Sequence, residues 1–143
     1  MSLLLPQLKG IPAPRPSLRS KVYWEGCRQH RLLYQRCAEC GYRGLSAFTV
    51  CAECHATSPV WDASAGRGSL YSWTVVWHPP NPSFRVPYAP AVVRLDEGVW
   101  MMSAVIGCEP DALHEGMRLA VEFHPASDEI TLPYFAPAIE GQP

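Results

Sequence analysis

The feature that most constrains this chain is a duplicated four-residue motif, CAEC, at residues 37–40 and again at residues 51–54. Each copy supplies two thiols from one tight turn, and the spacing of the four cysteines is C-x2-C-x10-C-x2-C. Four thiolates at this spacing are typical of a tetrahedral metal site, with structural zinc favoured and rubredoxin-like iron as the alternative. The expected metal ligands are Cys37, Cys40, Cys51 and Cys54.

A site filled by four thiolates has no open coordination position, so its expected role is structural rather than catalytic. The metal would fold a segment that is too short to build an apolar core of its own. Two disulfides are the competing interpretation, which a reducing compartment disfavours. His55 adjoins the second motif and is expected to be a surface residue, whereas Cys27 and Cys108 are expected to be small buried residues.

The composition indicates one globular domain built from short elements. The 143 residues are 48% hydrophobic and 17% charged, and they include 15 prolines and 10 glycines, which favour short strands and turns over long helices. The N-terminal MSLLLPQLKG is too short for a signal sequence or a membrane span. We therefore expect a soluble, cytoplasmic protein that does not contact a membrane.

The chain divides into three segments. Residues 1–30 are expected to form a proline-rich extended arm and a short helix over residues 17–26, with Ser17 as its N-cap and Gly26 at its end. Residues 31–62, here called the ribbon, are expected to hold the metal site, with RLLYQRC and AFTVC as strands that lead into the two motifs.

The pattern of residues 63–143 predicts strands separated by turns. GSLYSWTVVW is followed by two apolar strands around DEG, a short helix in EPDALHEG, and the strands MRLAVEFH and ITLPYF. This order is typical of the OB-fold, a five-stranded Greek-key barrel. The predicted fold class is mainly β: an N-terminal helix, a four-cysteine zinc ribbon and an OB-fold barrel with a C-terminal tail. The arm and the terminal AIEGQP are expected to be mobile unless a partner orders them.

Charge is distributed unevenly although the net charge is only −1. Residues 1–43 carry eight Lys and Arg against two Glu, a net of +6, and residues 44–143 carry four Arg against eleven Asp and Glu, a net of −7. The basic first third is suited to an anionic ligand or partner. The acidic remainder disfavours nucleic acid as a partner of the barrel.

Several stretches of the sequence resemble those of a family of small thiolase-associated proteins. Members of this family combine an N-terminal helix, a rubredoxin-like zinc ribbon and a C-terminal OB-fold. The stretches include YWEGCRQHRLLYQRCAECG, WDASAGRGSLYSWTVV and PYAPAVVRLDEGVWMMSAVIG, and the resemblance covers residues 15 to 125. One departure is LSAFTV before the second motif, where many relatives have a proline–arginine pair.

The resemblance implies a non-catalytic accessory subunit of a thiolase-superfamily enzyme, such as a lipid-transfer-protein-type thiolase or aldolase acting on acyl-CoA esters. Breakdown of steroid side chains or of fatty acids is the implied setting. The chain would stabilise its partner and help it to bind acyl-CoA. The implied partner is a thiolase-like or aldolase subunit in a hetero-oligomer, with two copies of each as one arrangement and a hotdog-fold hydratase as a further partner.

In this resemblance the four cysteines match the family's metal ligands, and Arg67 and Gly68 match the entry to the first barrel strand. Aromatic and cationic side chains are the candidates for contact with CoA or with the partner. These candidates are Tyr23, Trp24, Arg28, Arg36, Arg67 and His78.

Nothing in the sequence indicates autonomous catalysis. It contains no GxSxG, HExxH, phosphate-loop or dinucleotide motif, and its five histidines lie at no catalytic spacing. Two alternatives to an accessory subunit remain open. A free-standing acyl-CoA carrier would bind CoA esters by itself, and a single-stranded nucleic-acid-binding OB-fold module would show salt-dependent binding of an oligonucleotide.

Overall fold

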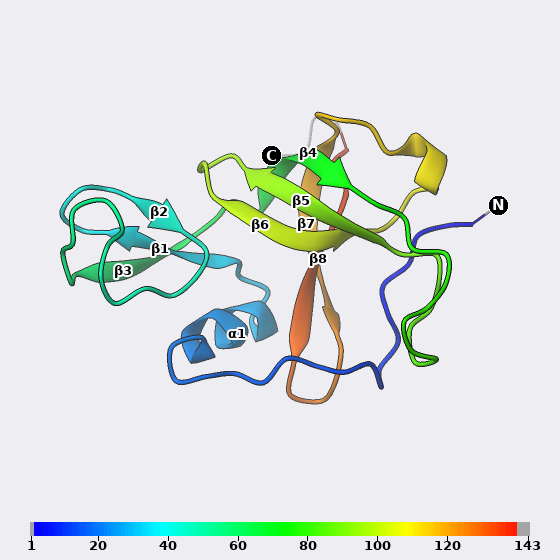
Figure 1. Ribbon diagram of the computed structural model, residues 1–143, viewed down its shortest axis with the longest axis horizontal. Coiled ribbons are helices and arrows are strands. Elements are labelled where there is room, and N and C mark those ends of the chain that lie inside the picture. The colour runs from blue at the N-terminus through cyan, green and yellow to red at the C-terminus, as the bar shows by residue number, and fades with distance from the viewer. Residues whose placement is uncertain (1, 140–143) are drawn as a thin grey trace.

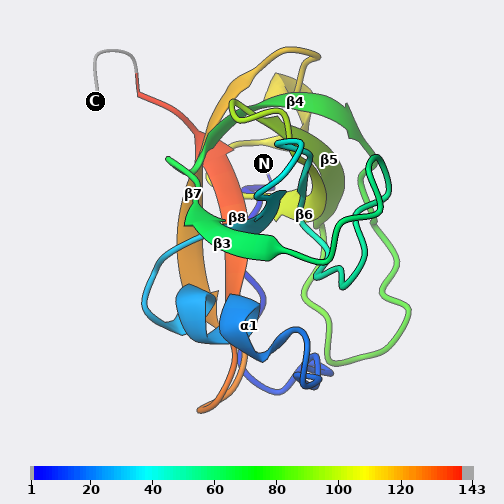
Figure 2. The ribbon, with the colours of Figure 1, turned by 90° about the vertical axis from the view of Figure 1, so that its left-hand side faces the viewer.

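The computed structural model describes residues 2–139 as a small sheet and a barrel that lie side by side, with one helix below them (Figure 1). The small sheet, seen at the front of Figure 2, has the strand order β2-β1-β3 and belongs to the ribbon. Its strands are antiparallel: β1 (Leu33–Cys37), β2 (Arg43–Gly44) and β3 (Pro59–Ala63).

The barrel closes in the order β4-β5-β6-β8-β7. Its strands are β4 (Arg67–Trp73), β5 (Ala89–Leu95), β6 (Trp100–Val105), β7 (Arg118–Pro125) and β8 (Thr131–Pro137). All pairs are antiparallel except β6 and β8, which meet in parallel at the single pair Val105 and Phe135. The predicted mainly β fold with a five-stranded barrel is confirmed.

Apolar side chains from every barrel strand fill the interior. Phe135, Leu119 and Val93 have no exposed surface, and Leu70 and Leu95 are almost as deeply buried. The short helix predicted in EPDALHEG is only a three-residue 3-10 turn, η1 (Pro110–Ala112), because the chain returns to an extended conformation at Leu113 to bury that side chain.

Helix α1 (Lys21–Arg28) begins four residues later than predicted and continues past Gly26. Ser17 is not its N-cap, because the Ser17 and Ser20 side chains hydrogen-bond each other in the preceding turn, at 3.0 Å between their Oγ atoms. Gly26 does not end the helix but lets β1 approach it. A Cβ at Gly26 would lie 2.7 Å from Cδ1 of Leu33.

The strand predicted in AFTVC does not form. The backbone N–H of Phe48 donates to the side-chain Oε1 of Gln35 at 2.6 Å instead of to a neighbouring strand. Gln35 is the buried polar side chain of β1, and it holds this loop against the sheet. The third strand is β3, which follows the second motif and pairs with β1 along its full length.

The arm before α1 packs on the barrel. Leu4 is fully buried, its N–H donates to the carbonyl of Cys108 at 2.9 Å, and its carbonyl accepts from Gly107 N–H at 2.8 Å. Residues 140–143 of the predicted tail AIEGQP lie outside the described residues. Among the described residues, no helix has the length and apolar character needed to cross a membrane.

Candidate metal centre

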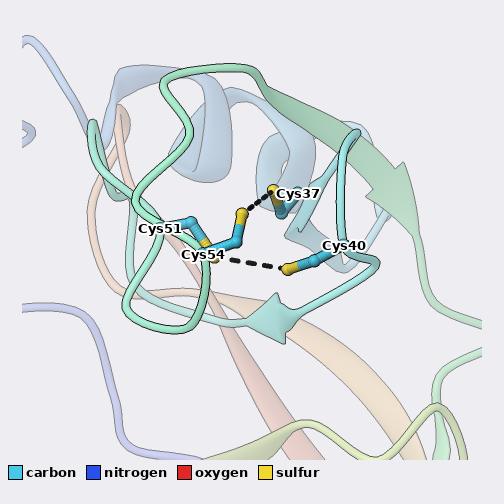
Figure 3. Close-up of side chains that lie close together, drawn as sticks. All are labelled: Cys37, Cys40, Cys51 and Cys54. Atoms are coloured by element: carbon cyan, nitrogen blue, oxygen red, sulfur yellow. Dashed lines mark hydrogen bonds between the residues drawn. The ribbon is translucent and has the colours of Figure 1, made fainter.

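The four sulfur atoms of the two CAEC motifs converge in the ribbon, where all lie within 4.8 Å of one another (Figure 3). The Sγ atoms of Cys37 and Cys54 are 3.6 Å apart, as are those of Cys40 and Cys51. All four cysteines are free thiols rather than disulfides. In each motif the first cysteine is buried and the second is exposed, so the cluster lies at the edge of the ribbon.

The two turns that present these thiols have equivalent backbones. The N–H of Gly41 donates to the carbonyl of Cys37 at 2.9 Å, and the N–H of His55 donates to that of Cys51 at 3.0 Å. Both closing residues are left-handed, with φ of 81° at Gly41 and 63° at His55. Glycine adopts this conformation freely, whereas histidine is strained in it.

Backbone amides in the turns stabilise sulfur charge. The backbone N–H of Cys40 is the main reason that the pKa of Cys37 falls to about 7, against the opposing effect of burial. For Cys40 the backbone N–H of Tyr42 acts in the same direction, but burial and the neighbouring thiols outweigh it and raise the pKa to about 12. Neighbouring thiolates repel one another, so close thiols do not all lose their protons on their own. A cation that replaces these protons stabilises the thiolates, and the cluster is therefore a suitable metal site.

The donor set fits a metal that prefers soft ligands. Four cysteine sulfurs make up the cluster, and His55, although adjacent in sequence, is exposed and is not part of it. This set matches zinc or iron rather than magnesium or calcium, which prefer oxygen. The structure therefore supports a cluster that can hold a metal ion.

A carboxylate in the β5–β6 turn helps to attach the ribbon to the barrel, in addition to the burial of Leu32 and Tyr34 in the shared apolar core. Glu97 accepts from the Ser64 hydroxyl at 2.7 Å and from the Ala65 N–H at 2.8 Å, just after β3. Its carbonyl also accepts from the Arg43 guanidinium at 3.1 Å. These contacts fix the exit of the ribbon at the point where the barrel begins.

Two of the predicted contact residues lie together on α1. The rings of Tyr23 and Trp24 are 4.9 Å apart, edge to face. Both line an apolar hollow between α1 and the barrel and a second hollow between α1 and the ribbon. Their predicted contact with CoA or a partner stays a prediction.

The other four predicted contacts are spread over the molecule and line neither hollow, among the residues that the structure describes. Arg28 is exposed at the end of α1. Arg36 in β1 pairs with Asp62 of β3 at 2.7 Å. Arg67 opens β4, where its carbonyl accepts from a backbone N–H, and His78 is exposed in the loop between β4 and β5. Their contact with a ligand or partner also stays a prediction.

Three residues that hold a loop or line a hollow were not predicted from the sequence. Gln35 gave no signal, because a glutamine in a strand reads as a solvent-facing residue until its neighbours are known. Leu5 and Ile11 form part of the hollow beside α1. Their apolar character within a proline-rich arm was the only available signal that the arm lies on a surface.

The histidines of the described chain show no partnership with a nucleophile. His30 stacks on Phe123 at 5.2 Å, and His124 lies 3.6 Å from a carboxylate oxygen of Glu122. His114 contacts the carbonyl of Ala112 at 3.1 Å. Within residues 2–139, no histidine is hydrogen-bonded to a serine, threonine or cysteine side chain.

Comparison with known proteins identifies relatives of the same architecture. Residues 61–124 match the family model described as the C-terminal OB-fold domain of ChsH2. A solved structure of an Ltp2–ChsH2(DUF35) aldolase contains a chain that is 34% identical, with a TM-score of 0.83 over 89% of this chain and 100% of that chain.

Two longer proteins are also similar. A probable enoyl-CoA hydratase alpha subunit of Thermomonospora curvata is 38% identical over 88% of this chain and 40% of its own length. A 3-oxo-4,17-pregnadiene-20-carboxyl-CoA hydratase alpha subunit of Mycobacterium tuberculosis is 31% identical over 77% of this chain and 35% of its own length. The chain thus spans less than half of either subunit. The match to the whole aldolase chain, at this identity, shows that the chain belongs to the ChsH2 (DUF35) family.

Proposed function

We propose that this protein is a non-catalytic accessory subunit of a thiolase-superfamily enzyme that acts on acyl-CoA esters. Its partner is a thiolase-like or aldolase subunit, which it stabilises and helps to bind acyl-CoA. Steroid or fatty acyl groups are the substrate class, because one similar protein is named as a hydratase of a steroid-derived CoA ester. A hotdog-fold hydratase is a further partner, since two similar proteins are named as hydratase subunits.

The observation that carries this proposal is the likeness to the ChsH2 chain of an aldolase. That likeness extends over the whole of the other chain, so it includes the ribbon and α1 as well as the barrel. A barrel alone would leave the function open, since OB-folds serve many functions. The shared combination of ribbon, helix and barrel supports a shared mode of assembly.

The chemistry of the chain supports a role without catalysis of its own. Four sulfurs would fill the coordination sphere of a zinc ion and leave no position for a substrate or a reactive water. We propose zinc as the metal in vivo, bound by Cys37, Cys40, Cys51 and Cys54. Its role is to fold the ribbon so that the ribbon, α1 and the barrel present one rigid surface to the partner.

The test is a tagged pull-down from native cells, with co-purifying proteins identified by mass spectrometry. We expect a thiolase-type protein to be retained at moderate salt, and the aldol or thiolysis activity of that protein to fall when this chain is removed. A Cys51→Ala variant should lose the partner, and Cys108→Ala, outside the cluster, should retain it. Recovery of the protein alone from cells that contain a thiolase would overturn the proposal.

One observation favours a second function, the binding of single-stranded nucleic acid. Tyr71 and Trp100 form an exposed edge-to-face pair on the barrel, 4.6 Å apart, and the guanidinium of Arg94 lies 5.8 Å from the Trp100 ring centre. Exposed aromatic and arginine side chains are suited to stacking on bases. Binding of an oligonucleotide that weakens steeply with salt, and that Trp100→Ala abolishes, would favour this function over the first.

A further inference from the structure

Strand β6 has one edge that is almost unpaired. On its other side it pairs with β5 along its full length, from Trp100 opposite Arg94 to Val105 opposite Ala89. Toward β8 it shares only the pair Val105 and Phe135. Among residues 2–139, the barrel is therefore closed at one end of β6 and open along the rest of this edge, which is the lower edge of β6 in Figure 1.

The backbone groups of Trp100 and Met102 point to the open edge. Successive residues of a strand present their N–H and C=O groups alternately to its two sides. The N–H of Ile106, just after β6, donates to the carbonyl of Phe135 at 2.8 Å, so the even-numbered positions face away from β5. Within the described residues no strand pairs with Trp100 or Met102 on that side, and their backbone groups are available to a further strand.

Pro133 explains why the pairing with β8 ends where it does. Continued by two residues, the parallel register of Val105 and Phe135 would require an N–H at residue 133 to donate to the carbonyl of Met102. Proline has no N–H, and the hydroxyl of Ser103 instead donates to the Pro133 carbonyl at 2.9 Å. The open edge thus follows from one residue of β8.

A cleft of about 590 Å³ between the ribbon and the barrel lies beside this edge. Its barrel side is formed by Trp100, Met101 and Met102, and side chains from residues 42–52, including Phe48 and Val50, form its ribbon side. Met102 is 76% exposed and Val50 is 53% exposed. Large apolar side chains that are exposed next to one another are typical of an interaction surface.

The charged side chains around the cleft are cationic. Among the described residues that line it, Arg43 is charged and none is acidic. Arg94 lies beside it, with its guanidinium 5.8 Å from the centre of the Trp100 ring. Within residues 2–139 neither arginine is ion-paired with a carboxylate. An occupant that carries a carboxylate would complement both arginines.

An extended polypeptide matches these properties together. Its backbone supplies the row of donors and acceptors that an unpaired strand edge needs, and its alternate side chains can enter an apolar cleft. A hydrocarbon chain would fill the cleft but would leave the N–H and C=O groups of Trp100 and Met102 unpaired.

We propose that an extended segment of the thiolase-type partner adds as a strand to the open edge of β6, beside the ribbon. The segment is apolar at alternate positions and carries an Asp or Glu that faces Arg43 and Arg94. This inference rests on the proposed function and names the surface through which the partner is held. The ribbon forms one wall of the groove, so a folded ribbon is needed for the strand to dock.

The first test is hydrogen–deuterium exchange, resolved to single amides, on the unaltered chain alone and in its complex with the thiolase-type partner. We expect the Trp100 and Met102 amides to exchange at least about tenfold more slowly in the complex. The amides of Met101 and Ser103 face β5 and are the internal controls, which should exchange slowly in both samples. Unchanged exchange at Trp100 and Met102 would overturn the inference.

Two substitutions at one position separate the backbone from the side chain. Met102→Pro removes the edge N–H, is tolerable on an edge strand, and should weaken partner affinity at least about tenfold because a partner carbonyl loses its donor. Met102→Val is similar in size to proline but keeps the N–H, and it should bind within about twofold of the unaltered chain. Equal affinities of the two variants would exclude strand addition.

A charge reversal keeps the test decisive if proline disturbs β6. Arg43→Glu lies on the ribbon, outside the barrel, and should weaken partner affinity about three- to tenfold, with a smaller effect at high salt. Arg15→Glu makes the same change of charge at an exposed position of the arm and should have no effect. Equal losses from both reversals would show that only net charge matters and would contradict a docked carboxylate.

The outcomes separate this inference from the proposed function. Recovery of a thiolase-type partner that leaves the Trp100 and Met102 amides unprotected overturns strand addition and leaves the accessory role in place. Protection that appears in the isolated chain and rises with its concentration shows that a second copy of the chain occupies the edge, which also overturns the inference alone. Failure to recover any thiolase-type partner overturns both.

Discussion

The ribbon and the barrel are stabilised by different means although they are parts of one short chain. The barrel encloses a continuous apolar core from all five strands, with Phe135, Leu119 and Val93 fully buried. The ribbon contributes Leu32 and Tyr34 to that core, and its other most buried groups include the thiols of Cys37 and Cys51. One unit is stabilised by burial of hydrocarbon, whereas we expect the other to depend also on a metal bound at the candidate centre.

Because of this difference, we expect the two units to unfold separately. They are linked by Glu97, which accepts from Ser64 and Ala65 after β3, and by Leu32 and Tyr34 of the ribbon, which belong to the same apolar core as the barrel residues. Because the two units use different interactions, loss of the metal should unfold the two CAEC turns and the strands beside them while the barrel remains, and loss of core packing should destabilise the barrel more than the thiol cluster.

Removal of one buried thiol should have the largest effect. Cys51→Ala leaves three ligands, so most of the metal-binding free energy, about 10 kcal/mol in small zinc domains, no longer supports the ribbon. Hydrogen–deuterium exchange should show the loss of protection in β1 and β3 with protection retained in β5. Cys108→Ala, a thiol outside the cluster, should change neither. Loss of protection in the barrel as well would contradict separate stabilisation.

Truncation of the barrel core should have the next largest effect. Phe135→Ala removes a fully buried ring from β8, and we expect the free energy of unfolding to fall by about 3–5 kcal/mol. Urea denaturation measures this loss, and metal content per chain should remain at one ion. Phe84→Ala in the half-exposed β4–β5 loop is the matched control and should cost much less. Equal costs would show that the loop is part of the core.

Loss of the charge at Glu97 should loosen the link between the two units. Glu97→Gln keeps one acceptor oxygen but removes the carboxylate that accepts from both Ser64 and Ala65, which should cost about 1 kcal/mol. Faster amide exchange at Ala65, with unchanged exchange inside β5 and β1, is the expected signature. Glu115→Gln, an exposed change, is the control. Unchanged exchange at Ala65 would mean that other contacts hold the link.

The smallest effect should come from the strained turn of the second motif. His55→Gly relieves a left-handed histidine at φ 63° and should stabilise the ribbon by about 0.5–1 kcal/mol. Slower release of zinc to a chelator is the measurement. Gly41→Ala, at φ 81° in the equivalent turn, should act in the opposite direction. Changes of the same sign would show that the two turns are not equivalent.

Local patterns predicted most of the barrel and missed parts of the ribbon. Alternating apolar residues and the DEG turn located the barrel strands, because each strand faces one core and its period of two is visible in sequence. AFTVC also has strand-forming residues, yet Gln35 takes its backbone hydrogen bond and leaves it a loop. In the same way, Gly26 was predicted to end the helix but lies inside α1. Because Gly26 has no Cβ, the helix leaves room for the side chain of Leu33.

The chemistry of the candidate metal site could be predicted from local sequence alone, because thiol spacing within two tight turns leaves few arrangements of four cysteines. Periodicity and turns also indicated the succession of barrel strands along the chain, which is typical of an OB-fold. The apolar hollow between the arm, α1 and strands β6 and β8 depends instead on long-range packing. The residues of that hollow span positions 5 to 134, and no local pattern records which distant side chains will share a wall.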